Sequence, residues 1–243
     1  MNAGRTARER VRAELVREIT EIARRQLATE GATGLSLRAV AREMGMVSSA
    51  IYRYFPSRDD LLTTLIIDGY NAVGTAVEKA EAACPREDYA GRWVAACRAV
   101  RAWALAHPHE YALVYGSPVP GYQAPERTIE PAARAAAVFG KVISDAYRAG
   151  ASGAPGPAPD QAGLTDPVPP VPESFAADAA RLREAIMDGV PDHIAAGALI
   201  AWSGLFGLVS FELFGQFENV VTDRAALFDH AVASLGRLTG LPA

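Results

Sequence analysis

Residues 37–55, LRAVAREMGMVSSAIYRYF, decide how the N-terminal part of the chain folds. They predict two short helices joined by a tight turn. Ala41 is small enough to let the second helix cross closely, and Gly45, four residues later, can adopt the left-handed backbone that the turn requires. Ile51, six residues after that, points back into the core. These spacings are typical of a helix-turn-helix, although an ordinary helical hairpin with a glycine turn also fits them.

The ends of these helices carry their own signals. Ser36 is a suitable N-cap for the first helix, and a second helix is expected over 47–54 with Ser48 as its cap. Ser57 and Asp60 have the spacing of a capping box at the start of a third helix. The apolar seam expected between the two short helices consists of Leu37, Val40, Met44, Val47 and Ile51.

The polar side chains of this segment suit DNA. Hydroxyl and guanidinium groups bind phosphates and base edges, and small residues at the start of the second helix let it approach a groove. The predicted DNA contacts lie on the second helix, on the helix before it and at the start of the next one: Arg38, Ser48, Ser49, Tyr52, Arg53, Tyr54 and Arg58.

The run at residues 51–61, IYRYFPSRDDL, resembles the signature of the TetR family of regulators. In that family the second helix of the motif continues into a Tyr-x-x-Phe-x-x-Lys-x-x-Leu pattern. Tyr52, Phe55 and Leu61 match this pattern, and Arg58 stands where the family usually has Lys, which keeps the positive charge. The resemblance covers about residues 11–65.

The C-terminal part resembles one subgroup of the family, the WHG type, named for a Trp and a later His-Gly pair. The resemblance runs from residues 107–120 to Trp202 and Gly207. Phe206 stands at the His position, so any role of that His is absent here.

The resemblance implies a homodimer that binds double-stranded operator DNA. Each subunit would place one recognition helix in the major groove of a palindromic operator, with the two helices about one turn of DNA apart or slightly more. A small-molecule effector in the C-terminal domain would change that separation and release the DNA, which is the behaviour of a repressor.

The composition predicts an all-α fold, because Ala, Leu, Arg and Glu are abundant and favour helices. Two domains are expected: a three-helix DNA-binding domain at 1–57 and a helical effector-binding and dimerisation domain at 58–243. Residues 150–172 are rich in Pro and Gly and predict a flexible insertion. The expected helices are 11–31, 37–44, 47–54, 58–83, 87–106, 108–115, 128–149, 173–188, 191–216 and 223–239.

The charge is unevenly distributed along the chain. The net charge is −4, yet residues 1–60 carry eleven Arg against eight Asp and Glu. A small basic N-terminal unit on an acidic body fits a local contact with phosphates.

The expected effector site is an apolar cavity lined by aromatic side chains. Any one of them is more often simply core, but so many in a small helical domain favour a pocket. The residues predicted to contact a lipophilic or aromatic effector are Trp103, Tyr111, Tyr115, Phe139, Tyr147, Trp202 and Phe206, with Trp93 as a further wall residue. The helices at 191–216 and 223–239 are expected to form the dimer interface, where Gly197, Gly204 and Gly207 would permit close helix approach.

Other classes of function lack a signal. The sequence has no nucleophile elbow, phosphate loop, His-Glu-x-x-His or Cys-x-x-Cys, so neither an enzyme nor a metal or cofactor site is expected. Residues 194–211 carry no charge and reach the lower length limit of a membrane span, but three glycines and acidic flanks argue against one. Without an N-terminal signal region, a cytoplasmic protein is expected. The alternative is a helical adaptor or a lipid- or small-molecule-binding protein whose head does not bind DNA.

Overall fold

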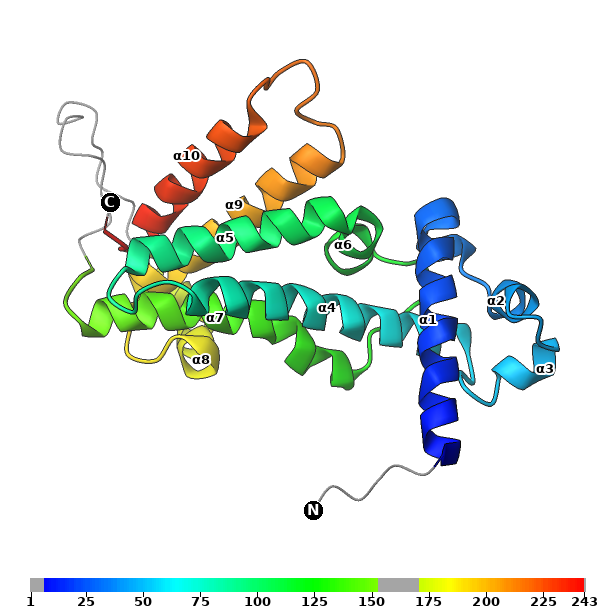
Figure 1. Ribbon diagram of the computed structural model, residues 1–243. Helices are drawn as coiled ribbons and strands as arrows, with labels where there is room; N and C mark the ends of the chain where they lie inside the picture. The colour runs from blue at the N-terminus through cyan, green and yellow to red at the C-terminus, as the bar shows by residue number, and fades with distance from the viewer. Residues whose placement is uncertain (1–6, 153–170, 243) are drawn as a thin grey trace. The chain divides into compact units, whose positions relative to one another are not determined.

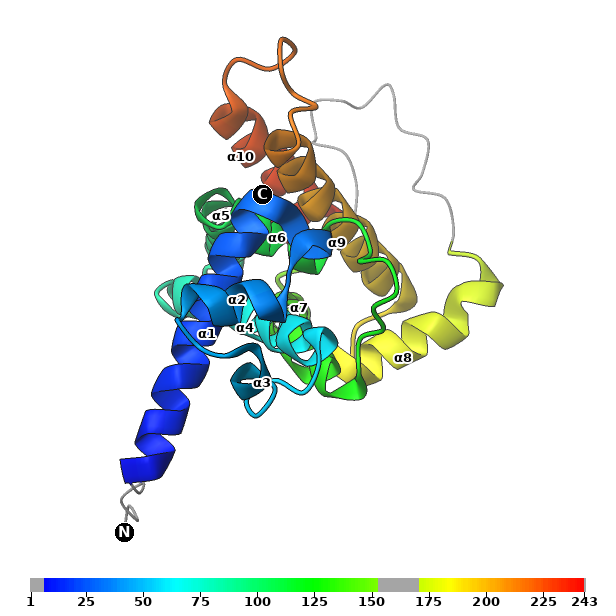
Figure 2. The ribbon, with the colours of Figure 1, turned by 90° about the vertical axis from the view of Figure 1, so that its right-hand side faces the viewer.

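The computed structural model describes residues 7–152 and 171–242, and within these ranges it consists of helices and their connections without a strand. The expected all-α fold is confirmed. Figures 1 and 2 show the helices, which form two compact units. Most of the predicted insertion at 150–172 lies outside the described residues.

The first unit contains the chain up to Asn71 and returns for His107–Pro131. Its helices are α1 (Ala7–Gly34), α2 (Leu37–Glu43), α3 (Ser48–Ile51), the beginning of α4 (Arg58–Ala82), α6 (Pro108–Tyr115) and the short η1 (Glu126–Thr128). The unit is larger than the predicted DNA-binding domain at 1–57, because α6 and the loop after it pack on the same core. The boundary at residue 57 stays a prediction.

The second unit contains the rest of α4, then α5 (Tyr89–Ala106), most of α7 (Ile129–Arg148), η3 (Glu173–Phe175), α8 (Ala176–Ile186), α9 (Asp192–Leu213) and α10 (Arg224–Leu238). In this unit α5 and α8 pack against α9, and α10 lies antiparallel to α9 (Figure 1).

The caps and turns of the head follow the sequence closely. We use "head" for α1, α2, α3 and the start of α4. The backbone of α1 leaves helical geometry at Gly31, where φ is 69°. The Ser36 side chain accepts a hydrogen bond from the Ala39 amide, and Gly45 has φ 68°. The amide of Asp60 donates to Ser57 Oγ at 3.1 Å, as the capping box predicts. The core of the head is a cluster that includes Ile19, Leu37, Val40, Ala41, Ile51, Phe55 and Leu61.

Two details of the motif differ from the prediction. Regular helix in α3 ends at Ile51, and the chain continues to Phe55 as hydrogen-bonded turns. Pro56 explains this ending, since it lacks an amide donor and disfavours helical backbone in the residue before it. Val47, with an extended backbone, occupies the cap position predicted for Ser48, and its side chain is 71% exposed instead of joining the seam. Met46 packs against the core in its place.

Glycine lets α9 and α10 approach closely. A Cβ atom on Gly197 would overlap the carbonyl oxygen of Leu238, and one on Gly204 would lie 2.8 Å from a methyl group of Leu235. A Cβ atom on Gly207 would meet nothing within 4 Å. Two of the three predicted close-approach glycines therefore serve the packing of this chain against itself, and Gly207 faces open space.

This difference gives a matched pair of substitutions. Gly197→Ala should lower the free energy of unfolding by about 1–3 kcal/mol, because the overlap with backbone exceeds the gain in helix propensity. Gly207→Ala should leave the stability unchanged or raise it by up to about 1 kcal/mol. Urea unfolding of both variants tests this, and equal stability of the two would contradict the packing described.

Candidate nucleic-acid interface and ligand cavity

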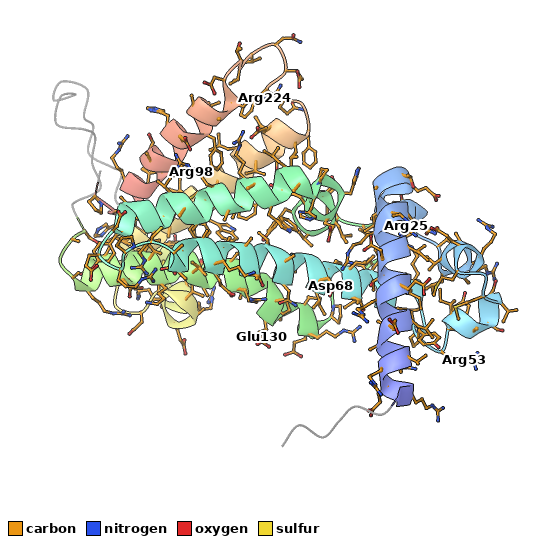
Figure 3. All side chains as sticks on the ribbon, viewed as in Figure 1. Arg25, Arg53, Asp68, Arg98, Glu130 and Arg224 are labelled. Atoms are coloured by element: carbon orange, nitrogen blue, oxygen red, sulfur yellow. The ribbon has the colours of Figure 1, made fainter. Side chains whose placement is uncertain are left out.

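The polar side chains predicted to contact DNA lie on the surface of the head. Arg38 on α2 and Ser48 and Ser49 on α3 are exposed, as are Tyr52 and Arg53 in the turns that follow. Figure 3 labels Arg53, which projects from the outer surface of the head. The turn at Gly45 and the cross-packing of α2 on α3 bring these residues together.

The arginines of this surface differ from most others in the protein. Arg24, Arg92, Arg101 and many others bind carboxylates. The guanidinium groups of Arg38, Arg42 and Arg53 have no hydrogen-bond or ion-pair partner within residues 7–152 and 171–242. Their positive charge therefore remains available for an external anion.

Two of the predicted contact residues also hold the head together. Arg58 donates through Nε to the carbonyl oxygen of Leu35 at 3.1 Å and through Nη2 to that of Ala32 at 2.6 Å. It thereby fastens α4 to the turn between α1 and α2. The half-buried Tyr54 packs against the core and lies under the guanidinium of Arg12 at 5.3 Å. Arg58 and Tyr54 therefore stabilise the head, and their contact with DNA remains a prediction.

Within the first unit, an ion-pair cluster joins three helices. Arg24 of α1 lies 2.8 Å from Asp68 of α4 and 3.5 Å from Glu110 of α6. Burial raises the pKa of Asp68, and Arg24 opposes that rise only in part. The cluster fixes the direction of α1 with respect to the first part of α4, which is labelled at Asp68 in Figure 3.

The second unit contains a partly open apolar cavity of about 100 Å³ between α5, α7, α8 and α9. Aromatic rings follow one another along its wall. The ring centroids of Trp93 and Phe139 lie 5.1 Å apart, and those of Phe139 and Trp202 lie 5.8 Å apart. The lining residues are Trp93, Ala136, Phe139, Gly140, Ile143, Leu182, Ile186, Met187, Ala198, Leu199, Trp202 and Leu205.

The predicted effector contacts are divided between several places. Phe139 and Trp202 line the cavity, and Phe206 packs on Trp202 with ring centroids 4.5 Å apart. Trp103 is buried in α5 without lining this cavity, and Tyr147 is 39% exposed near the end of α7.

Tyr111 and Tyr115 belong to the first unit instead. Tyr115 makes an edge contact with Tyr70 at 5.7 Å, and burial raises its pKa. The prediction from aromatic residues missed the aliphatic residues of the cavity wall and Gly140. The small residues Ala136, Gly140 and Ala198 in otherwise apolar helices are the signal that the sequence offers for them.

A buried charge network lies in the same unit as the cavity. The Arg92 side chain is 1% exposed and donates to Glu81 at 2.6 Å and to Asp145 at 2.8 Å. A third bond goes to the carbonyl oxygen of Arg86 at 2.9 Å. One guanidinium therefore ties the C-terminal end of α4, α5 and α7 together.

One face of α9 is apolar and exposed. Ile200 and Phe211 of α9 and its C-cap residue Phe214 are exposed and recur at helical spacing together with Gly207. Among the described residues, α9 is also the one helix that is long and apolar enough to cross a membrane, by a criterion of length and composition that the core helix of a soluble protein also meets. A contiguous exposed apolar face of this kind marks an interaction surface.

Known proteins match both parts of the chain. A sequence profile of bacterial regulatory proteins of the tetR family matches residues 19–65, and one of the tetracyclin repressor-like C-terminal domain matches residues 93–235. The HTH-type transcriptional regulators Rv1816 of Mycobacterium tuberculosis and Mb1846 of Mycobacterium bovis are each 40% identical over 227 residues, covering 93% of this chain and 90% of each relative.

Solved structures agree with this assignment. The crystal structure of SCO4313, described as a regulatory protein, is 36% identical, covers 95% of this chain and 98% of its own, and has a TM-score of 0.72. The TetR family regulator PfmR from Thermus thermophilus shares the fold at 16% identity, with coverages of 93% and 99% and a TM-score of 0.55. The chain therefore belongs to the TetR family of bacterial transcriptional regulators.

Proposed function

We propose that the chain is a ligand-responsive repressor that leaves a palindromic operator when a small apolar molecule occupies the cavity of its second unit. The observation that carries this proposal is the exposed surface of Arg38, Ser48, Ser49, Tyr52 and Arg53, in which the arginines lack internal partners within the described residues. Phosphates would hold the head in register, and the side chains after α3 would read base edges in the major groove. A regulator of this kind acts on the chromosome, so we place it in the cytoplasm.

The cavity supports the effector part of the proposal. Its walls are almost wholly apolar, and its volume of about 100 Å³ suits a small ring or a short chain. α7 and α9, which supply much of the wall, are the helices on which an effector would act. The effector would lower operator affinity by favouring a conformation with a different separation of the two heads.

The exposed face of α9 supports a homodimer. The symmetry of a palindromic operator requires two heads, and a twofold interface presents the same surface from both subunits. Helices α9 and α10 of one subunit would pack on their mates as a four-helix bundle. Gly207, beside which the chain leaves open space, would allow the two copies of α9 to approach closely.

The dimer can be disrupted at one residue. Ile200→Glu places a charge on the α9 face at a side chain that is 58% exposed, so the fold should be retained while the dimer dissociates. Light scattering after size exclusion should show monomers. Leu105→Glu, on α5 and 43% exposed, is the matched control and should remain dimeric. A dimer in both variants would place the interface elsewhere.

The operator is tested with DNA that flanks the gene of this protein. We expect a specific gel shift whose affinity falls steeply between about 50 and 200 mM salt, because neutralised phosphates release counterions. An unlabelled competitor of random sequence separates specific from general binding. No specific shift with any flanking fragment would favour the alternative of a helical small-molecule-binding or adaptor protein.

A further inference from the structure

Two hollows of the second unit share a wall. The apolar cavity lies on one side, and a polar groove of about 430 Å³ lies between α7 and the end of α8 on the other. Ile186 and Met187 line both of them. Methionine side chains are flexible, so a ligand can displace the Met187 side chain that separates the two hollows.

Helix α7 lines both hollows. Gly140 lines the apolar cavity, and Ser144, one turn later, lines the groove. A Cβ atom on Gly140 would overlap the carbonyl oxygen of Ile186, which shows how closely α7 meets the end of α8. Along α7, Ser144 therefore follows the cavity-lining Gly140 by about one helical turn.

The Ser144 hydroxyl is buried and unused. Ser144 is 2% exposed, and its Oγ has no hydrogen-bond partner within the part of the chain that the structure describes. Buried hydroxyl groups are nearly always satisfied, so one that is not calls for an explanation such as a ligand. The walls of the neighbouring cavity supply almost no polar anchor of their own.

Three cationic residues (Lys141, Arg148, Arg183) and three anionic ones (Asp145, Glu184, Asp188) line the groove, and the cations differ in how firmly they are paired. The carboxylate of Asp145 is occupied by Arg92 at 2.8 Å and Lys141 at 2.7 Å, and Arg183 is bound to Asp192. Arg148 is less engaged, since its nitrogens lie 3.5 Å from Asp145 and 4.0 Å from Asp188. Its guanidinium keeps donors for a further oxygen. The carboxylates of Asp188, which is 94% exposed, and of the exposed Glu184 are solvated at the rim.

We propose that the effector is a small carboxylic acid with an apolar body. The body occupies the cavity beside Trp93 and Trp202, and the carboxylate passes Met187 to accept hydrogen bonds from Ser144 and Arg148. Arginine matches the planar geometry of a carboxylate, and bonds to a charged acceptor are the strong ones. This inference rests on the proposed function, which makes the cavity the effector site.

The experiment compares three probes of one shape: benzoate, benzyl alcohol and toluene. Each is titrated into the purified full chain while tryptophan fluorescence is recorded, because Trp93 and Trp202 line the cavity. Benzoate should bind more tightly than toluene. Ser144→Ala and Arg148→Gln should each weaken benzoate about 10-fold, in line with a lost bond to a charged group, and should change toluene less than about 2-fold.

Controls keep the outcome interpretable. Ser174→Ala and Arg181→Gln remove an exposed hydroxyl and an exposed guanidinium that do not line the groove, and both should bind benzoate as the wild type does. Ala136→Leu fills the cavity and should abolish binding of all three probes.

Three results would overturn the inference: no binding of benzoate, an equal effect of Ser144→Ala on all three probes, or a Ser144 dependence confined to benzyl alcohol. If toluene still binds and Ala136→Leu abolishes that binding, the cavity remains the effector site and only the carboxylate anchor is refuted. Operator binding is measured separately and does not depend on either result.

Discussion

Replacing Arg92 with Leu is expected to destabilise the folded protein by about 3–5 kcal/mol, although leucine is the more hydrophobic residue. The side chain is 1% exposed and holds two carboxylates and one carbonyl oxygen. Removing it leaves Glu81 and Asp145 with buried charge that only more exposed partners can compensate. The midpoint of thermal unfolding should fall by roughly 6–20 °C at a fixed protein concentration.

The pH dependence of this loss has a definite sign. Burial by itself raises the pKa of Glu81, but hydrogen bonds from Arg92 and Arg86 outweigh it and hold that pKa below its ordinary value. Burial opposed by Lys141 and Arg92 likewise leaves the pKa of Asp145 lowered. Both groups therefore stabilise the fold above about pH 4, and this contribution is lost as the pH falls through their folded pKa values.

In Arg92→Leu, fewer positive charges offset the burial of the two carboxylates, so the pKa values of Glu81 and Asp145 rise. The difference in stability between wild type and variant should therefore be largest near neutral pH and shrink below about pH 4. Arg98→Leu is the matched control on the same helix. Arg98 is 60% exposed and pairs with Asp229, so its loss should change stability by less than about 1 kcal/mol. Equal losses in the two variants would contradict the buried network.

Neither the burial of Arg92 nor its partners could be predicted from the sequence. An arginine within the helical pattern of 87–106 indicates a solvated face, and its burial depends on carboxylates from α4 and α7 that are distant in the chain. Caps and turn residues predict structure only within a few residues of themselves. The Ser36 cap, the Gly45 turn and the bond from the Asp60 amide to the Ser57 hydroxyl are each decided within four residues, and all three follow from the sequence; the Asp60 carboxylate accepts from the Ser57 hydroxyl.

The same limit explains why the residues of the proposed effector cavity could be predicted only in part. Aromatic residues indicate that a cavity can form, but not which helices enclose it. Tyr111 and Tyr115 lie in the first unit because α6 returns to α1, whereas Phe139 and Trp202 meet because α7 and α9 face one another. Contacts between distant segments also extend the first unit beyond the head. Tyr122 bonds to Thr63 at 2.9 Å across a long stretch of chain, which no periodicity records.

The second large effect is expected at the surface that we propose to bind DNA. Arg53→Ala should weaken operator binding about 5- to 150-fold, the range for one lost base-edge contact, and Tyr52→Ala should add a further loss. Both side chains are exposed, so neither change should affect stability beyond about 0.5 kcal/mol. Fluorescence anisotropy with labelled operator measures the affinity, and urea unfolding checks the fold.

The way in which affinity falls identifies the contact that was lost. If Arg53 reads a base edge, discrimination between operator and random DNA shrinks; if it binds a phosphate, both affinities fall together and the salt slope decreases by about 1. Arg17→Ala is the control for charge. It removes the same charge from a 77% exposed side chain that lies about 140° around α1 from Arg12, the residue that contacts the backbone of Arg53. Unchanged binding in both Tyr52→Ala and Arg53→Ala would place the DNA contacts elsewhere on the head, whereas a loss that Arg17→Ala matches would reduce the effect to general electrostatics.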